Sequence, residues 1–223
     1  MIGTERESSL HRALKFRYSG DGGETEALTG DFICDARTSD GEFIEVQTGS
    51  FGPLKEKVKT LTRTGKVRII HPIIVRKEIE LYDTEGKLLR RRTSPKKGCC
   101  WDLFRALLYA PDLPLFKNLT VELALVDVLE KRVADSKGSW RRKGVSINDR
   151  FLSAWHEGII LSKPKDYNRF IPFTKKERFT VRNLSEKTGI DTSLAGKCLY
   201  VLNKMGLVER VGKKGNSLIY KTT

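Results

Sequence analysis

Asp35, Glu45 and Gln47 are the residues of this sequence whose types and spacing best suit metal-assisted chemistry. They lie on two expected strands, 32–37 and 42–48, joined through an Asp-Gly pair that favours a hairpin. A hairpin brings Asp35 alongside Glu45, and Gln47 shares a face with Glu45 because strand side chains alternate. Two carboxylates at one sheet edge suit Mg2+ or Mn2+. Such a cation polarises a phosphoryl group and activates water.

The elements that must position these residues follow a regular order. Apolar spacing predicts a helix over 5–18, and a short extended piece is expected around 26–28 before the two strands. Pro53 opens a second helix, and an apolar strand follows over 66–75. The order is therefore helix, two or three strands, helix, strand. The apolar residues of the two strands indicate burial on both sides, and a buried carboxylate needs a partner or a metal. The alternative is that these carboxylates lie on a solvated face of the sheet.

In this order and in Asp35 and Glu45-Val46-Gln47, the sequence resembles the PD-(D/E)XK nuclease superfamily. The family's pattern is an acidic residue on the second strand and Glu-x-Lys on the third. The resemblance implies an α/β (α+β) restriction-endonuclease-like core with a central mixed sheet. It also implies a metal site of Asp35 and Glu45, completed by a glutamate of the first helix, for which Glu7 fits better than Glu5. Glu26 is a further candidate carboxylate.

Gln47 departs from the family's pattern, because lysine is usual at its position. Glutamine orients water or a phosphate oxygen but carries no charge. Lys55 or Lys57, on the following helix, could bring a cation into the vacant space. Gln47 also favours the alternative that the nuclease-like domain is catalytically silent.

The middle of the chain adds further predicted elements. We expect a hairpin over 78–92, a buried helix over 101–109, a strand over 119–133 and a helix from Asn148 to about residue 156. Lys163-Pro164-Lys165 is the expected linker. These features predict a nuclease-like domain of residues 1–162 and a second domain of residues 163–223.

The second domain has the order of a winged helix-turn-helix module. Helices are expected over 180–187 and 193–205, followed by a hairpin that turns at 213–216. This order resembles the winged-helix family, in which the second helix enters the major groove and the hairpin contacts phosphate or the minor groove. The resemblance gives these candidate DNA contacts: Ser193, Lys197, Tyr200, Lys204, Lys213 and Lys214.

Each of these binding assignments has an alternative. Winged helices also bind proteins, and Tyr200 could belong to the core. Arg141, Arg142 and Lys143 could clamp phosphate while Trp140 stacks on a base, or they could be a solvated charge run. The same two interpretations apply to Arg90–Arg92.

Charge and composition favour a polyanionic partner. The 223 residues carry a formal net charge of +14. Residues 163–223 hold 14 Lys and Arg against 5 Asp and Glu, so most of the excess lies in the second domain. The four cysteines form no CxxC pair, which argues against zinc and disulfides. No apolar run approaches the roughly 20 residues of a membrane span, and residues 1–12 lack a signal sequence, so we expect a cytoplasmic protein.

These observations lead to two hypotheses of different class. In the first, the protein is a metal-dependent DNA endonuclease that a winged helix delivers to duplex or branched DNA. In the second, it is a DNA-binding regulator or scaffold with an inactive nuclease-like domain. A third possibility is a subunit that is active only within a defence or mobile-element complex. Nucleases of this superfamily often form homodimers. No membrane and no small-molecule substrate is expected.

Overall fold

The structure is a computed structural model that describes residues 7–223, so Glu5 lies outside the described residues. Its helices and strands, in chain order, are α1 (Ser9–Ser19), β1 (Glu24–Thr29), β2 (Phe32–Arg37), β3 (Phe43–Val46), α2 (Lys55–Thr64), β4 (Val67–Tyr82), β5 (Leu88–Thr93), α3 (Leu103–Leu107), β6 (Leu119–Val133), β7 (Ser146–Trp155), β8 (Ile159–Leu161), α4 (Val181–Thr188), α5 (Thr192–Lys204), β9 (Val208–Lys214) and β10 (Ser217–Thr222). Short 3-10 turns connect several of them.

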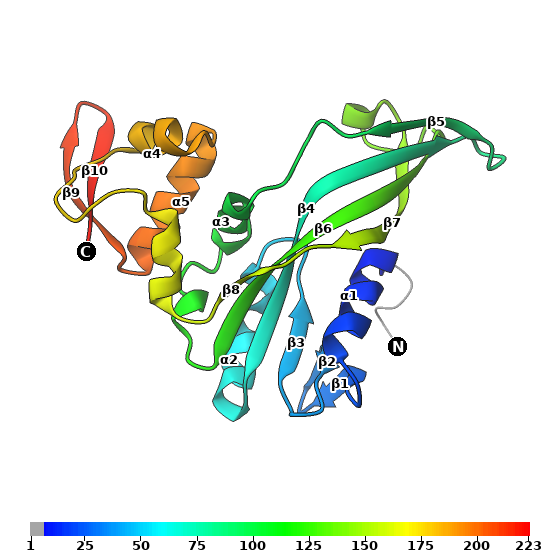
Figure 1. Cartoon of the computed structure of the whole chain (residues 1–223), viewed down its shortest axis with the longest axis horizontal. Coiled ribbons are helices and arrows are strands. Elements are labelled where there is room, and N and C mark those ends of the chain that lie inside the picture. The colour runs from blue at the N-terminus through cyan, green and yellow to red at the C-terminus, as the bar shows by residue number, and fades with distance from the viewer. Residues whose placement is uncertain (1–6) are drawn as a thin grey trace.

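The centre of the molecule is a mixed sheet with the order β1-β2-β3-β4-β6-β7 (Figure 1). β4 runs parallel to both β3 and β6, and the β1–β2, β2–β3 and β6–β7 pairs are antiparallel. β5 joins β4, and β8 joins β6. The predicted α/β (α+β) class with a central mixed sheet is therefore confirmed.

Helices α1 and α2 cover opposite faces of this sheet. Leu10 and Leu14 of α1 pack in one core with Ile70, whereas Val58 of α2 packs in another with Ile69. Ile69 and Ile70 are neighbours on β4, so their side chains point to opposite faces. The first half of the chain therefore places a helix on each side of β3.

β4 and β6 extend well beyond the other strands and form an arm together with β5 and β7 (Figure 1). β4 and β6 pair in parallel from Val67 and Leu119 to Tyr82 and Val133. The turn after β4 and the loop 134–145 after β6 both lie at the end of this arm, where the amide of Ala134 donates to the carbonyl of Tyr82.

One prediction for the middle of the chain was wrong, and another gave a helix that is too long. Residues 146–155 form β7 and not a helix, because the long strand β6 offers an edge whose backbone groups β7 satisfies. The Asp149 carboxylate of β7 instead accepts from the amide of Ser9, the first residue of α1, at 2.9 Å. The buried helix expected over 101–109 is shorter, at Leu103–Leu107 after a 3-10 turn.

The C-terminal residues form the expected helices and hairpin. Thr180 caps α4, Gly189 ends it with a left-handed backbone, and Asp191 caps α5 through the amide of Leu194 at 2.8 Å. β9 and β10 pair antiparallel, and Phe179 bridges to Tyr220, which ties the start of this module to its last strand. We refer to residues 179–223 as the C-terminal module.

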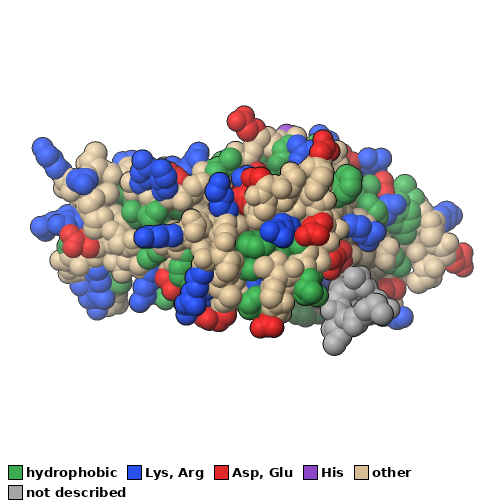
Figure 2. All heavy atoms as spheres, turned by 90° about the horizontal axis from the view of Figure 1, so that it is seen from below, with side chains coloured by type: hydrophobic (Ala, Val, Ile, Leu, Met, Phe, Trp, Pro, Cys, Tyr) green, Lys and Arg blue, Asp and Glu red, His purple; other side chains and the backbone are tan. Residues whose placement is uncertain are grey.

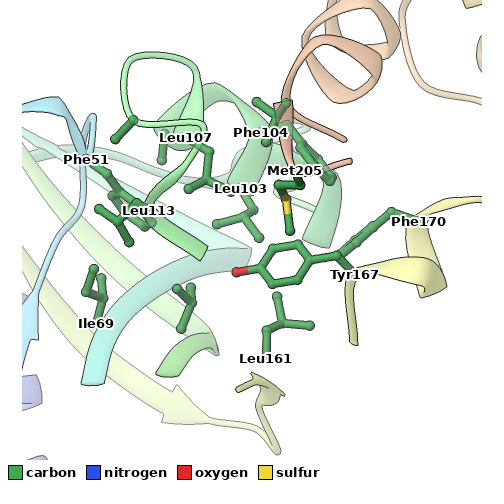
Figure 3. Close-up of a cluster of buried hydrophobic side chains, with 14 of the residues drawn as sticks. Phe51, Ile69, Leu103, Phe104, Leu107, Leu113, Leu161, Tyr167, Phe170 and Met205 are labelled. Atoms are coloured by element: carbon green, nitrogen blue, oxygen red, sulfur yellow. The ribbon is translucent and has the colours of Figure 1, made fainter. Parts of the chain in front are cut away.

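One continuous core joins this module to the sheet. The expected linker at Lys163-Pro164-Lys165 instead opens a 3-10 helix, Pro164–Phe170, whose Tyr167 and Phe170 are buried. Figure 3 shows Tyr167 and Met205, the residue that follows α5, packing among residues that include Leu103 and Leu161. The connection is therefore part of the core and not a free tether, because these aromatic side chains are withdrawn from water. Among the described residues, no helix is long and apolar enough to span a membrane.

Candidate functional site

Asp35 lies on β2 beside the end of β3. Ala36 pairs with Ile44, so Asp35 and Glu45 follow next along the two antiparallel strands. The Oδ2 atom of Asp35 accepts from the amide of Val46 at 2.7 Å and lies 3.2 Å from Nε2 of His11 on α1. The two strands thus lie together as the hairpin prediction expected, and α1 adds a further partner for Asp35.

Asp35 is a carboxylate stabilised in its charged form. Burial raises the pKa of this carboxyl, but the hydrogen bonds from His11 and from the Val46 amide outweigh burial. The pKa of Asp35 therefore lies below its ordinary value, and the group is ionised at neutral pH.

Lys15 of α1 is the centre of an acidic cluster that the sequence reasoning missed. Its Nζ lies 3.0 Å from Glu7, 3.6 Å from Asp35, and in direct contact with Glu26. Burial lowers the pKa of Lys15, but these carboxylates outweigh burial and leave the pKa raised. The spacing of Glu7, His11 and Lys15, four residues apart, was the available signal, because such residues share one helix face.

Glu7 and Glu26 therefore both lie at Lys15, close to Asp35, but each differs in one respect from what was expected. Glu7 precedes the Ser8 cap of α1 and so lies before the helix on which it was expected. Its Oε1 atom is buried and accepts no hydrogen bond from a described residue, although Lys15 lies close to it. Glu26 adopts a left-handed backbone, with φ at 56°, and half of its side chain is exposed.

Glu45 is buried on the α2 side of β3 and pairs with Lys57. The ammonium of Lys57 also donates to the carbonyl of Ile33 at 2.7 Å, which fixes it against β2. Lys55 instead pairs with Asp112 at 2.9 Å, so of the two lysines proposed to replace the missing cation only Lys57 lies at Glu45.

The two carboxylates differ in their acidity. Burial raises the pKa of Glu45, Lys57 opposes this shift, and the negative charge of Asp35 adds to it. The net pKa of Glu45 lies above its ordinary value, whereas that of Asp35 lies below. Environments that shift the pKa values of two neighbouring carboxyl groups in opposite directions are common at functional sites.

Gln47 does not face the carboxylates through its amide. Its side-chain nitrogen donates to the carbonyl of Ser50 at 2.6 Å, and its backbone carbonyl lies 2.6 Å from Nδ1 of His71. Gln47 therefore holds the loop after β3. His71 itself is buried.

The described residues do not fit a divalent cation in this arrangement. Carboxylate oxygens are suitable donors, but Asp35 is neutralised from α1 and Glu45 from α2, on opposite faces of the sheet. No group of three or more His, Cys, Asp or Glu side chains in the described part of the chain is placed to hold a metal ion. In the described residues each carboxylate already has a lysine beside it, Lys15 for Asp35 and Lys57 for Glu45, and the metal site of Asp35 and Glu45 stays a prediction.

The predicted contacts of the C-terminal module lie on its surface. Ser193, Tyr200 and Lys204 are exposed on α5, and Lys197 donates to the hydroxyl of Ser193 at 2.8 Å. Tyr200 is 44% exposed and stacks with Lys204, so its alternative placement in the core was wrong. Figure 2 shows Lys and Arg side chains gathered over the end of the molecule that holds this module.

The hairpin and the arm carry the remaining candidates. Lys213 and Lys214 are exposed at the end of β9. Trp140 is 83% exposed at the end of the arm, and Arg141 lies over its ring. Arg142 donates to the carbonyl of Val145 at 3.1 Å, and Lys143 is exposed. Arg142 therefore uses one of its donors within its own loop, whereas the side chains of Arg141 and Lys143 are exposed.

Comparison with known proteins gives relatives but no function. No solved structure matches the chain. A protein of Treponema pallidum (strain Nichols), described as an uncharacterized protein, is 34% identical over 221 residues, which cover 99% of this chain and 87% of the relative. A family model described as a domain of unknown function (DUF8091) matches residues 8–162. These residues make up most of the chain, which therefore belongs to the DUF8091 family.

Proposed function

We propose that this protein is a DNA-binding protein in which a nuclease-like α/β domain is joined to a C-terminal winged helix. The observation that carries the proposal is the exposed face of α5, where Ser193, Lys197, Tyr200 and Lys204 lie beside a hairpin with a basic end. In a winged helix these are the helix that enters the major groove and the wing that contacts the backbone. The cytoplasm is the proposed location, supported by four free thiols.

Two features support nucleic acid over a protein partner for this module. Its cations are exposed, and the acidic residues among residues 163–223 are far fewer than the basic ones. Lys204 stacked on Tyr200 also gives α5 an aromatic and cationic pair that can contact both base and phosphate.

The binding experiment replaces both exposed lysines of the wing. A Lys213→Ala/Lys214→Ala variant should bind duplex DNA more weakly, roughly uniformly across sequences, because its lost contacts are to phosphate. A matched control is Lys175→Ala/Lys176→Ala, which removes two exposed lysines of the connecting segment. Equal affinity of wild type and wing variant at moderate salt would indicate a protein-binding module instead.

A second candidate function, metal-dependent hydrolysis of DNA, is favoured by a specific observation. Lys57 supplies to Glu45 the ammonium that Gln47 lacks, and the raised pKa of Glu45 marks it as a perturbed group. We assign no hydrolytic step to it, because the described carboxylates do not form a metal site.

A cleavage experiment separates the two functions. Wild type and Glu45→Ala are incubated with plasmid and branched DNA in the presence of Mg2+ or Mn2+. A binding protein leaves both substrates intact, whereas a nuclease cuts them and loses activity in the Glu45→Ala variant. Equal cutting by both proteins would show that Glu45 is not the catalytic residue.

A further inference from the structure

The arm carries a face on which positive charge is concentrated. Glu130 of β6 is fully buried and contacts three cations: Lys77 at 3.5 Å, Arg132 at 2.5 Å and Arg150 at 2.8 Å. All three therefore lie on the same face of the arm as Glu130. Burial raises the pKa of Glu130, but the hydrogen bonds from Arg150 and Arg132 and the charge of Lys77 outweigh burial and leave the pKa below its ordinary value. The carboxylate is therefore ionised and neutralises only one of the three charges.

Strand β5 adds two more arginines to this face. Arg92 pairs with Ile79 and Arg90 pairs with Leu81, and the same two residues of β4 pair with Glu130 and Arg132 of β6. Directly paired residues project to one side of a sheet. Arg90 and Arg92 are exposed, and no carboxylate of a described residue forms an ion pair with either.

The opposite face of the arm has a different balance. Glu78 and Glu80 project there, and Glu78 binds Arg91 at 2.6 Å and Arg76 at 3.0 Å. The acidic residues of β4 are thus separated from the Glu130 side. Exposed charges on the edge strand β5 would by themselves be explained as protection against aggregation. That explanation does not account for three cations gathered around one buried carboxylate on a single face.

Lys77 of this basic face also lies at a cleft of about 710 Å³. Lys77 lines it together with Lys96 and Lys97, which follow β5 and are exposed. The other wall includes Gly189 and Asp191, at the turn between α4 and α5. Lys77 is thus shared between the cluster around Glu130 and this cleft, whose other wall includes the turn before the proposed recognition helix.

We propose that this face of the arm is a second DNA-binding surface, which holds the phosphate backbone of duplex DNA through Arg90, Arg92, Lys96 and Lys97. Glu130 holds the guanidinium groups of Arg132 and Arg150 in place beside them. Only Nε of Arg150 donates to Glu130, so its terminal nitrogens keep their capacity to bind phosphate. The surface carries no base-reading pattern, and its binding is therefore independent of sequence. This inference rests on the proposed DNA-binding function.

The test uses the full chain and a duplex of about 30 base pairs, roughly 100 Å long. Its affinity is measured by fluorescence anisotropy between 50 and 200 mM salt. Each phosphate contact contributes about 0.9 to the slope of log K against log salt. The Arg90→Gln/Arg92→Gln variant should reduce that slope by about 2, with a weaker affinity on every sequence.

The control variant is Arg76→Gln/Arg91→Gln. It also removes two exposed arginines from the arm, but from the opposite face. It should bind as wild type does. An equal loss in both variants would mean that only net charge matters, and an unchanged slope for Arg90→Gln/Arg92→Gln would overturn the arm surface directly.

The wing variant separates failure of this inference from failure of the proposed function. If Lys213→Ala/Lys214→Ala weakens binding and Arg90→Gln/Arg92→Gln does not, DNA binding by the winged helix is supported and DNA binding by the arm is contradicted. If wild type itself shows no salt-dependent binding to the duplex, the proposed function falls, and the arm surface falls with it.

Discussion

At the scale of single residues, two lysines neutralise the carboxylates of the candidate site. Lys57 neutralises Glu45 from α2, and Lys15 neutralises Asp35, Glu7 and Glu26 from α1. The sequence predicted the neighbouring positions of Asp35 and Glu45, because hairpin pairing follows from local turn chemistry. It did not predict Lys15, because the direction in which α1 presents its faces depends on docking against the sheet.

The pair of Lys57 and Glu45 gives a prediction for stability. Lys57→Ala should lower the free energy of unfolding at pH 7 by about 3 kcal/mol, because it leaves a buried carboxylate without its partner. The pKa of folded Glu45 is raised, so the group becomes neutral as pH falls through that raised value. The loss should therefore shrink near pH 4, which urea denaturation at both pH values measures.

Two variants control this measurement. Lys55→Ala removes a half-exposed partner of Asp112 and should cost less than about 1 kcal/mol. Glu45→Gln in the Lys57→Ala background should restore most of the stability. A loss that is the same at pH 7 and pH 4 would contradict an ionised Glu45.

At the scale of elements, local signals were sufficient for helix ends and insufficient for one strand. The strands over 32–37 and 119–133 match β2 and β6, and the caps Thr180, Gly189 and Asp191 follow from residue type. Most of β7 was predicted as a helix, because Asn148 looks like a helix cap. Its state is decided by pairing with β6, a partner distant in sequence.

The cap of α4 gives the prediction at this scale. The Thr180 hydroxyl accepts from the amide of Asn183 at 3.3 Å, and the Asn183 side chain accepts from the amide of Thr180 at 3.0 Å. Thr180→Ala should cost about 1 kcal/mol in thermal unfolding, because one amide of the first turn loses its acceptor. Thr180→Ser keeps the oxygen and should cost much less. Equal losses in both variants would assign the effect to the methyl group.

At the scale of the whole molecule, the continuous core decides how the two parts behave. The predicted boundary at residue 162 coincides with the end of the family match, yet Tyr167 and Phe170 pack against the first part, and Leu194 of α5 is buried. Composition and motifs distinguished the two parts. Composition and motifs could not reveal how the two parts pack together, because an interface depends on the shapes of both parts and not on local sequence pattern.

This packing predicts a single unfolding transition of the full chain. Far-ultraviolet circular dichroism and tryptophan fluorescence should give coincident thermal curves, because Trp101 contacts Phe170 across the junction at 5.2 Å between ring centroids. Two separated transitions would show that the C-terminal module unfolds independently of the sheet.

The most direct test of the central claim, that α5 faces DNA, is photo-crosslinking from position 200. A benzophenone side chain replaces Tyr200, and in a second protein it replaces Phe16, an exposed aromatic residue of α1. Each protein is irradiated with labelled duplex DNA at low salt. If α5 lies against DNA, a covalent protein–DNA product forms from position 200 and little forms from position 16. Binding of DNA without a crosslink from position 200, or equal crosslinking from both positions, would contradict that claim.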